Sequence, residues 1–244
     1  MGYARIVGRL VALIGALGFY LLLHAGWRAI GAHSPWPRRF LARVGRIVGA
    51  RLTIAGAPRD RDVMLLANHL SWIDIMLIAD ATGAAFVAKA ELESVPIIGW
   101  LCRLNDTIFV ARANRLGIAD QVASVRQVLA TGRPVAIFPE GTTGDGVTLA
   151  VFKPALVAAL DPPPPGIVAQ GVRIDYDAPE LAWVDDEPGL RHARRVLARR
   201  GTFEARLTFC AIIDPGVCRG RKSIAMEARR RIEQAAVSAS LAIG

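Results

Sequence analysis

The stretch VMLLANHLSWIDIMLIADA at residues 63–81 decides the fold that the sequence predicts. Its first five residues are all apolar, which is typical of a short strand buried on both faces of a sheet. The apolar run at residues 72–81 indicates a helix, and Ser71 suits the N-cap of that helix. His69 then lies at the carboxyl end of a strand, where open α/β sheets bind their ligands.

Strand-like and helix-like segments alternate along most of the chain. The sequence predicts strands at residues 63–67, 85–88, 107–111, 135–138, 167–174 and 203–213. It predicts helices at residues 72–81, 118–131, 153–160, 190–200 and 223–241. This alternation predicts an α/β fold with a mixed, largely buried sheet flanked by helices.

An apolar segment lies near the N-terminus. Residues 10–27 carry no acidic or basic side chain other than His24, and their length is close to the minimum for a membrane-spanning helix. The arginines that follow outnumber those that precede, so the positive-inside rule predicts an inner (cytoplasmic) membrane helix with the main body in the cytoplasm. A cleaved signal peptide is the alternative interpretation.

The next segment, residues 38–50, places apolar side chains at helical spacing with arginines on the other faces. This pattern fits a basic amphipathic helix on anionic lipid, and it equally fits a helix packed against the body of the domain. We therefore expect residues 1–57 to hold an N-terminal membrane helix and a basic amphipathic segment. Residues 58–244 would form the catalytic domain.

Composition limits the classes of partner. The chain has 244 residues with 30 Lys and Arg against 21 Asp and Glu, a formal charge of +9. Such a charge attracts nucleic acid, anionic lipid or acidic ligands. Nucleic acid is disfavoured because aromatic residues are not interleaved with the basic ones. The three cysteines have no C-x-x-C spacing and the four histidines no metal-ligand spacing, so we expect neither disulfides nor a metal site.

Two passages combine residues suited to catalysis. His69 and Asp74 are five residues apart, so they would not share a helical face, and the chain must turn between them. Asp74 would then fold back toward the imidazole, or it would serve only the helix, as the acidic member of a capping box with Ser71. The second passage, VAIFPEGTTGDG at residues 135–146, runs from a buried strand into a loop whose glycines allow close approach to a polar substrate.

These passages resemble motifs of the lysophospholipid acyltransferases, the family that includes 1-acylglycerol-3-phosphate acyltransferase. The N-H-x-x-x-x-D motif matches Asn68, His69 and Asp74, and the F-P-E-G-T motif matches residues 138–142. The block between them also matches, at Lys89, Glu91, Leu92, Pro96, Gly99, Trp100, Ile108, Phe109, Val110 and Arg112. Beyond residue 174 the match is weaker, through Tyr176, Trp183, Asp185 and the segment Gly220, Arg221 and Lys222. The resemblance implies the glycerolipid acyltransferase fold.

The resemblance also implies roles for individual residues. His69 would be the general base that takes the proton of a lysolipid hydroxyl, and Asp74 would orient it. The residues that would bind the acyl acceptor are Phe109, Arg112, Glu140, Gly141, Thr142 and Thr143. Further candidates are Asn68, Lys89, Asp145 and Lys153. The acyl group would come from an acyl-CoA or acyl carrier protein thioester, with no other cofactor and no metal.

The chain departs from the family at Thr143, where an arginine that suits a phosphate is usual, and at Asp106 and Ala155, where glycine is common. With threonine in place of that arginine, the segment EGTTGDG at residues 140–146 resembles the one in acyltransferases that acylate lyso-ornithine lipid. The headgroup of that lipid has an amine and a carboxylate and no phosphate. Asp145 would meet that ammonium, or it would be only a turn residue. Arg112 or Lys153 would remain as phosphate ligands.

The sequence therefore favours a membrane-associated O-acyltransferase. The first expected acceptor is 1-acyl-sn-glycerol-3-phosphate, which would yield phosphatidic acid in phospholipid biosynthesis, and the alternative is lyso-ornithine lipid. A non-catalytic, membrane-anchored lipid-binding protein is disfavoured because His69, Asp74 and Glu140 are all present. A serine hydrolase is disfavoured because the chain has no G-x-S-x-G motif and Ser71 suits a helix cap better.

Overall fold

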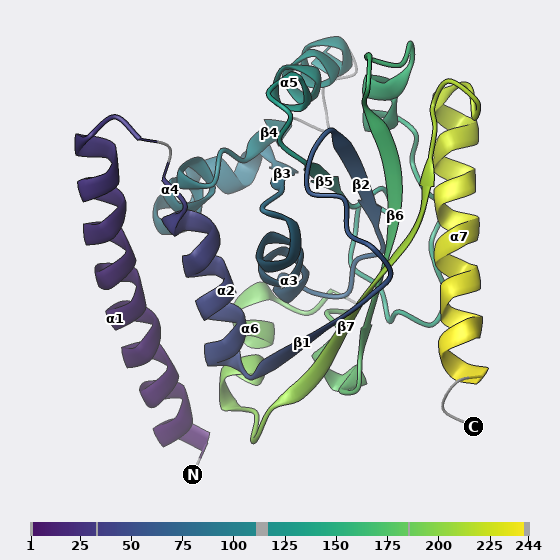
Figure 1. Ribbon diagram of the computed structural model, residues 1–244. Helices are drawn as coiled ribbons and strands as arrows, with labels where there is room; N and C mark the ends of the chain where they lie inside the picture. The colour runs from purple at the N-terminus through teal and green to yellow at the C-terminus, as the bar shows by residue number, and fades with distance from the viewer. Residues whose placement is uncertain (1, 33, 111–116, 185, 242–244) are drawn as a thin grey trace.

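The computed structural model describes residues 2–32, 34–110, 117–184 and 186–241 (Figure 1). Its centre is a seven-stranded sheet with the order β1-β7-β6-β2-β5-β3-β4. The strands are β1 (Ala50–Ala55), β2 (Val63–Ala67), β3 (Ala85–Lys89), β4 (Ile108–Val110), β5 (Val135–Ile137), β6 (Val168–Tyr176) and β7 (Phe203–Ile213). All neighbouring strands are parallel except β6 and β7, which are antiparallel. The predicted mixed sheet is confirmed.

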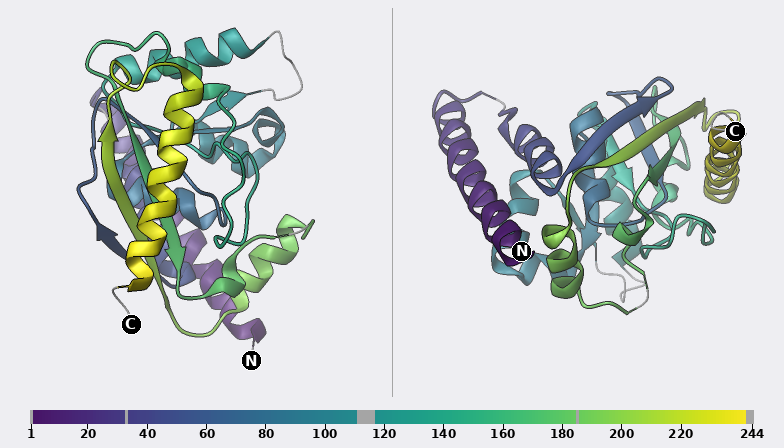
Figure 2. Two further views of the ribbon diagram at one scale, coloured as in Figure 1. Left: turned by 90° about the vertical axis from the view of Figure 1, so that its right-hand side faces the viewer. Right: turned by 90° about the horizontal axis from the view of Figure 1, so that it is seen from below.

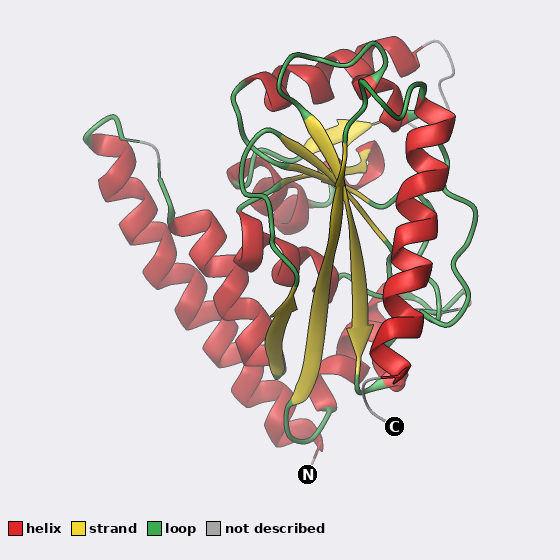
Figure 3. Ribbon diagram, turned by 45° about the vertical axis from the view of Figure 1, so that its right-hand side comes forward, coloured by secondary structure: helices red, strands yellow, loops and turns green. Residues whose placement is uncertain are grey.

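Helices cover both faces of this sheet (Figures 2 and 3). One face carries α2 (Trp36–Val48), α3 (Ile73–Thr82) and α6 (Gly189–Ala198), and the other carries α5 (Ile118–Ala130) and α7 (Arg221–Leu241). The remaining helices in the described part of the chain are α1 (Gly2–Ala29), α4 (Pro96–Leu104), and the 3-10 helices η1 (Ala90–Ser94), η3 (Leu156–Leu160) and η4 (Pro179–Leu181).

Strand β2 shows why its sequence is continuously apolar. Val63 and Leu65 pack in the core that contains α3, whereas Met64 and Leu66 pack in the core that contains α5 and α7. All four side chains are fully buried. Because successive residues of a strand point to opposite faces, a strand between two helical layers needs apolar residues at every position.

Three elements differ from the sequence-based prediction. Strand β1 lies in the sheet beside β7, ahead of residue 58, the predicted start of the catalytic domain. It is an edge strand of six residues of which only one is buried, so it has no continuous apolar run to reveal it. Helix α4 is also absent from the prediction. Residues 153–160, predicted as a helix, form only the short η3, because the Lys153 N–H donates to Pro139 O at 2.8 Å and holds that residue in a loop.

Helix α2 resolves the two interpretations of residues 38–50. Its stripe of small and apolar residues is buried, at Ala42, Val44, Gly45 and Val48. At Gly45 the helix lies so close to α3 that a β-carbon there would be 3.5 Å from that of Met76. The stripe therefore packs against the domain, and Arg39, Arg43 and Arg46 lie on the exposed side.

Helix α1 is, among the described helices, the one long and apolar enough to cross a membrane, and none of its described residues is buried. It runs alongside α2 (Figure 1). The rings of Tyr20 and Trp27 contact the ring of Trp36, with centroids 6.0 and 5.9 Å apart. Aromatic contacts therefore join the C-terminal half of α1 to the start of α2.

Candidate active site

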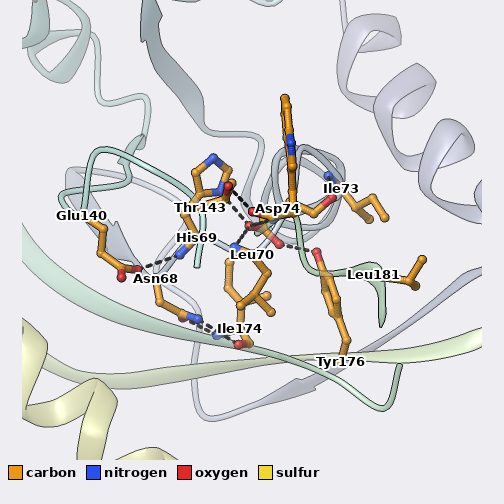
Figure 4. Close-up of polar contacts among 12 residues, drawn as sticks. Asn68, His69, Leu70, Ile73, Asp74, Glu140, Thr143, Ile174, Tyr176 and Leu181 are labelled. Carbon is orange, nitrogen blue, oxygen red and sulfur yellow. Dashed lines mark hydrogen bonds and ion pairs between the residues drawn. The ribbon is translucent and has the colours of Figure 1, made fainter. Parts of the chain in front are cut away.

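The candidate site forms where two neighbouring parallel strands end. Strands β2 and β5 pair in register, with Leu66 opposite Ile137, so the chain leaves both at the same edge of the sheet. We call residues 68–74 the β2 turn and residues 138–146 the β5 loop. Figure 4 shows side chains of the turn and of the loop converging at this edge. The structure therefore brings the two predicted motifs together.

The β2 turn joins His69 to Asp74. His69 Nδ1 lies 2.8 Å from Asp74 Oδ2, and the same oxygen accepts the N–H groups of Leu70 and Ser71 at 2.7 and 3.0 Å (Figure 4). Asp74 is fully buried. Helix α3 begins at Ile73, whose N–H donates to Ser71 Oγ at 3.3 Å. Asp74 therefore does both things that its spacing suggested: it closes the turn before the helix and it binds the imidazole.

The imidazole of His69 is held in one orientation. The carboxylate of Asp74 is an acceptor, so Nδ1 carries the proton and Nε2 has a free lone pair. The ring of Phe138 stacks on the imidazole, with centroids 3.9 Å apart and planes 15° apart. The His69 side chain stays 18% exposed, and within the described residues Nε2 has no hydrogen-bond partner. This is the arrangement of a general base open to a substrate.

Glu140 ties the β5 loop to the β2 turn. Its Oε1 accepts the N–H of His69 at 3.0 Å, and its Oε2 accepts the N–H of Ala150 at 2.9 Å. In return, the N–H of Gly144 donates to His69 O at 2.8 Å. Burial raises the pKa of Glu140, and the two backbone N–H groups oppose that rise. Its contacts here are with the backbone, and its predicted contact with the acceptor stays a prediction.

Thr143 binds a segment that the predicted site does not include. Its hydroxyl donates to Trp183 O at 2.5 Å, and the Trp183 N–H donates to Leu70 O at 2.7 Å. One peptide segment thus holds both the β5 loop and the β2 turn. At this position, where the family usually has arginine, the structure has a neutral hydroxyl engaged with a carbonyl.

Asp145 makes the contacts of a turn residue. Its Oδ1 accepts the N–H groups of Val147 and Thr148 at 2.8 and 3.2 Å, and these bonds lower the pKa of Asp145. The residue is exposed. Its carboxylate is therefore charged at neutral pH and accessible, whether or not a substrate ammonium binds to it.

The other predicted residues are distributed around this edge. Asn68 is buried and bonds both the N–H and the carbonyl of Ile174, at 2.7 and 3.0 Å, so it fastens the β2 turn to β6. Lys89, Thr142 and Lys153 are exposed, Phe109 is half-buried on β4, and Gly141 closes a turn on Phe138 O at 3.0 Å. Arg112 lies outside the described residues.

Three hydrogen bonds in and behind the site have no counterpart in the sequence prediction. The hydroxyl of Tyr176, at the end of β6, donates to Asp74 Oδ1. Behind the turn, His192 of α6 accepts the indole N–H of Trp72 at 3.0 Å and donates from Nε2 to Leu181 O at 3.1 Å. Burial lowers the pKa of His192, in keeping with this neutral form. In the sequence, the weak family match at Tyr176 is the one signal for any of these contacts.

Among the described residues, no group of three or more His, Cys, Asp or Glu side chains could hold a metal ion. The described site offers an imidazole, a carboxylate and the backbone groups around them. Such groups suit proton transfer to and from a nucleophile that the substrate supplies.

Known proteins resemble this chain in sequence and in fold. The sequence model of a family described as Acyltransferase matches residues 51–168. A lyso-ornithine lipid O-acyltransferase of Rhodobacter capsulatus is 33% identical over 89% of this chain and 86% of its own. A 1-acyl-sn-glycerol-3-phosphate acyltransferase of Neisseria meningitidis is 34% identical over 55% of this chain and 56% of its own.

A crystal structure of the 1-acyl-sn-glycerophosphate acyltransferase of Thermotoga maritima has the same fold, with a TM-score of 0.71, 18% identity, and 98% of each chain covered. The predicted resemblance is thereby confirmed, together with the acyltransferase fold. The chain belongs to the lysophospholipid acyltransferase family.

Proposed function

We propose that this acyltransferase moves a fatty acyl group from an acyl-CoA or acyl carrier protein thioester to the free hydroxyl of a lysolipid. The observation that carries the proposal is the His69–Asp74 pair. Nδ1 is bound to a buried carboxylate, Nε2 has no hydrogen-bond partner among the described residues, and the His69 side chain stays partly exposed. A thioester is already activated, so the weak nucleophile is the group that needs a base.

The reaction needs one base and no covalent enzyme intermediate. His69 Nε2 takes the proton of the acceptor hydroxyl as its oxygen bonds to the thioester carbonyl carbon. Asp74 stabilises the imidazolium through Nδ1–H. When the tetrahedral intermediate collapses, the C–S bond breaks and the imidazolium returns its proton to the leaving thiolate. The products are the ester and the free thiol.

As the acceptor we propose lyso-ornithine lipid, which the sequence alone places second to lysophosphatidate. The relative from Rhodobacter capsulatus that bears this name aligns with 89% of the chain, whereas the one from Neisseria meningitidis aligns with 55%. The hydroxyl of Thr143, bound to Trp183 O, offers no positive charge to a phosphate. The exposed carboxylate of Asp145 suits the ammonium of an ornithine headgroup.

Lysophosphatidate remains the second candidate because of Lys153. Its side chain is exposed, and its backbone N–H bonds Pro139 O at 2.8 Å, so a cation stands directly beside the β5 loop. An ammonium in this place would pair with a phosphate as a point charge.

A competition assay separates the two acceptors. The purified protein in lipid vesicles receives equal amounts of lyso-ornithine lipid and lysophosphatidate, with acyl-CoA in one arm and acyl carrier protein thioester in the other. We expect ornithine lipid as the main product. A majority of phosphatidic acid would overturn the proposed acceptor and leave the acyl transfer standing, and no product in either arm would overturn both.

Helix α1 is attached to the body of the enzyme at both ends. Near its start, Arg5 donates to Ala198 O and Arg9 donates to Val196 O, each at 2.9 Å. Toward its end, aromatic rings contact Trp36. A helix of 28 residues is about 42 Å long, so a bilayer-crossing α1 would carry one of these ends away from the body.

We therefore propose that α1 lies along the body and inserts its exposed apolar face into the cytoplasmic leaflet of the inner membrane, with the catalytic domain facing the cytoplasm. Large apolar side chains exposed on it include Val11, Ile14, Phe19 and Leu22. A cysteine introduced by Tyr3→Cys should not react with a membrane-impermeant maleimide added to spheroplasts. Labelling from outside would show that α1 crosses the bilayer.

A further inference from the structure

One hydrogen bond behind the base takes no part in the steps above. Tyr176, the last residue of β6, donates its hydroxyl to Asp74 Oδ1 across 102 positions of sequence (Figure 4). We propose that Tyr176 is a positioning residue, which holds the carboxylate of Asp74 in the one orientation that presents Oδ2 to His69. The proposal rests on the proposed role of His69 as the general base.

The two oxygens of Asp74 have separate partners. Oδ2 accepts the imidazole Nδ1–H and two backbone N–H groups of the turn. Oδ1 accepts the hydroxyl of Tyr176. Without that bond, only the hydrogen bonds at Oδ2 would oppose rotation about the bond between Cβ and Cγ, and Oδ2 could turn out of line with the imidazole. The phenol therefore sets the plane of the carboxylate, and the carboxylate sets the plane of the imidazole.

Tyr176 keeps its proton while it does so. The partners of Asp74 at Oδ2 are all placed as donors, so the carboxylate serves as an acceptor there and accepts the hydrogen bond of the phenol at Oδ1. Removal of the phenol from water and the nearby charge of Asp74 raise the pKa of Tyr176 well above its ordinary value. The hydroxyl is thus a fixed donor that does not exchange protons with the substrate.

Strand β6 holds both ends of the β2 turn. At the start of the turn, the side chain of Asn68 bonds the backbone of Ile174. At its end, Asp74 bonds the side chain of Tyr176, two residues further along the same strand. Tyr176 itself is set by its pairing with Ala205 of β7. The sheet therefore fixes the distance that the turn spans.

The test is Tyr176→Phe, assayed with the acceptor that the unmodified enzyme uses. The ring and its edge contact with Phe203, at 5.5 Å between centroids, are retained, and only the O–H is lost. We expect kcat to fall about 10- to 100-fold, the effect of one lost hydrogen bond to a charged group, with KM within about twofold. The acidic limb of the pH profile of kcat/KM should move to lower pH, because a carboxylate that is no longer aligned with Nδ1–H stabilises the imidazolium less.

Two controls separate positioning from stability. Tyr3→Phe makes the same change on an exposed residue of α1 and should alter nothing. Phe203→Leu loosens the packing around the ring but keeps the phenol O–H, so it should lower the unfolding temperature without moving the pH profile. This control shows what destabilisation alone does, even where Tyr176→Phe itself unfolds more easily.

The outcomes are distinct. An unmodified enzyme that transfers no acyl group would overturn the proposed function. An active enzyme whose Tyr176→Phe variant keeps its kcat and its pH profile would overturn the positioning role alone. So would a Phe203→Leu variant that reproduces both the fall in kcat and the shifted profile, because both effects would then follow from loosened packing.

Discussion

The β2 turn and the β5 loop leave the sheet side by side, but they are held in different ways. The turn is closed largely by its own residues, since Asp74 bonds the imidazole and two N–H groups within five positions of itself. The loop depends on hydrogen bonds with residues outside it, such as those of Thr143 with Trp183 O and of Glu140 with the N–H of Ala150. Local bonds therefore close the turn, to which Tyr176 adds one bond from β6, whereas contacts from outside the loop hold the β5 loop.

The largest effect should come from the turn. His69→Ala removes the base, and we expect kcat/KM to fall about 1000-fold, within the range that general bases contribute. The measurement is transfer of a radiolabelled acyl group to the acceptor by vesicle-bound protein. Flotation with vesicles should be unchanged, because His69 lies far along the chain from α1. Activity retained at a tenth or more of the original would contradict the proposed mechanism.

Breaking the link between the two regions should have the next largest effect. In Glu140→Gln the side chain offers one acceptor in place of two, so a backbone N–H of His69 or Ala150 loses its partner. We expect a loss of about 1–3 kcal/mol in the free energy of unfolding near neutral pH. Chemical denaturation of both proteins measures it.

The pH dependence of this difference has a defined sign. Burial raises the pKa of Glu140 above its ordinary value of 4.5, so the folded state binds this proton more tightly than the unfolded state. The stability gained from this tighter proton binding is fully present below pH 4.5 and is lost as the pH rises through the raised pKa of Glu140. The unmodified protein should therefore lose stability relative to Glu140→Gln over that interval, and a gain would contradict the raised pKa.

The loop should control the choice of acceptor. Thr143→Arg supplies the guanidinium that the family usually has, and we expect the ratio of kcat/KM for lysophosphatidate over lyso-ornithine lipid to rise about 10-fold. Thr143→Val removes the hydroxyl bond to Trp183 without adding charge, and it is the matched control. An equal change of the ratio in both variants would show that the loop's shape, not the cation, decides the acceptor.

The smallest effect should come from Asp145. Asp145→Asn keeps an oxygen for the N–H groups of Val147 and Thr148 and removes the charge, so stability should change by no more than about 0.5 kcal/mol. If the carboxylate pairs with the ammonium of lyso-ornithine lipid, KM for that acceptor rises by up to about fivefold, as for an exposed ion pair. An unchanged KM would leave Asp145 as a turn residue alone.

Sequence patterns predict those strands and helices whose burial follows from their own run of apolar residues. The five apolar residues of β2 indicate a strand between two layers, and the structure buries every one of them. The edge strand β1 escapes the same reasoning, because its position beside β7 depends on the order of strands rather than on an apolar run. Arg5 and Arg9, which the sequence shows only as charges before an apolar segment, donate to carbonyls at the end of α6.

The sequence by itself determined the strand, the turn and the pair His69 and Asp74, because their hydrogen bonds join residues a few positions apart. Only the tertiary structure decided that Tyr176 holds Asp74 and that Trp183 holds Thr143. These contacts span 102 and 40 positions, so they depend on which strands are neighbours and in what register. Local side-chain patterns specify which face of a strand is buried, but they do not specify which distant segment will pack against it.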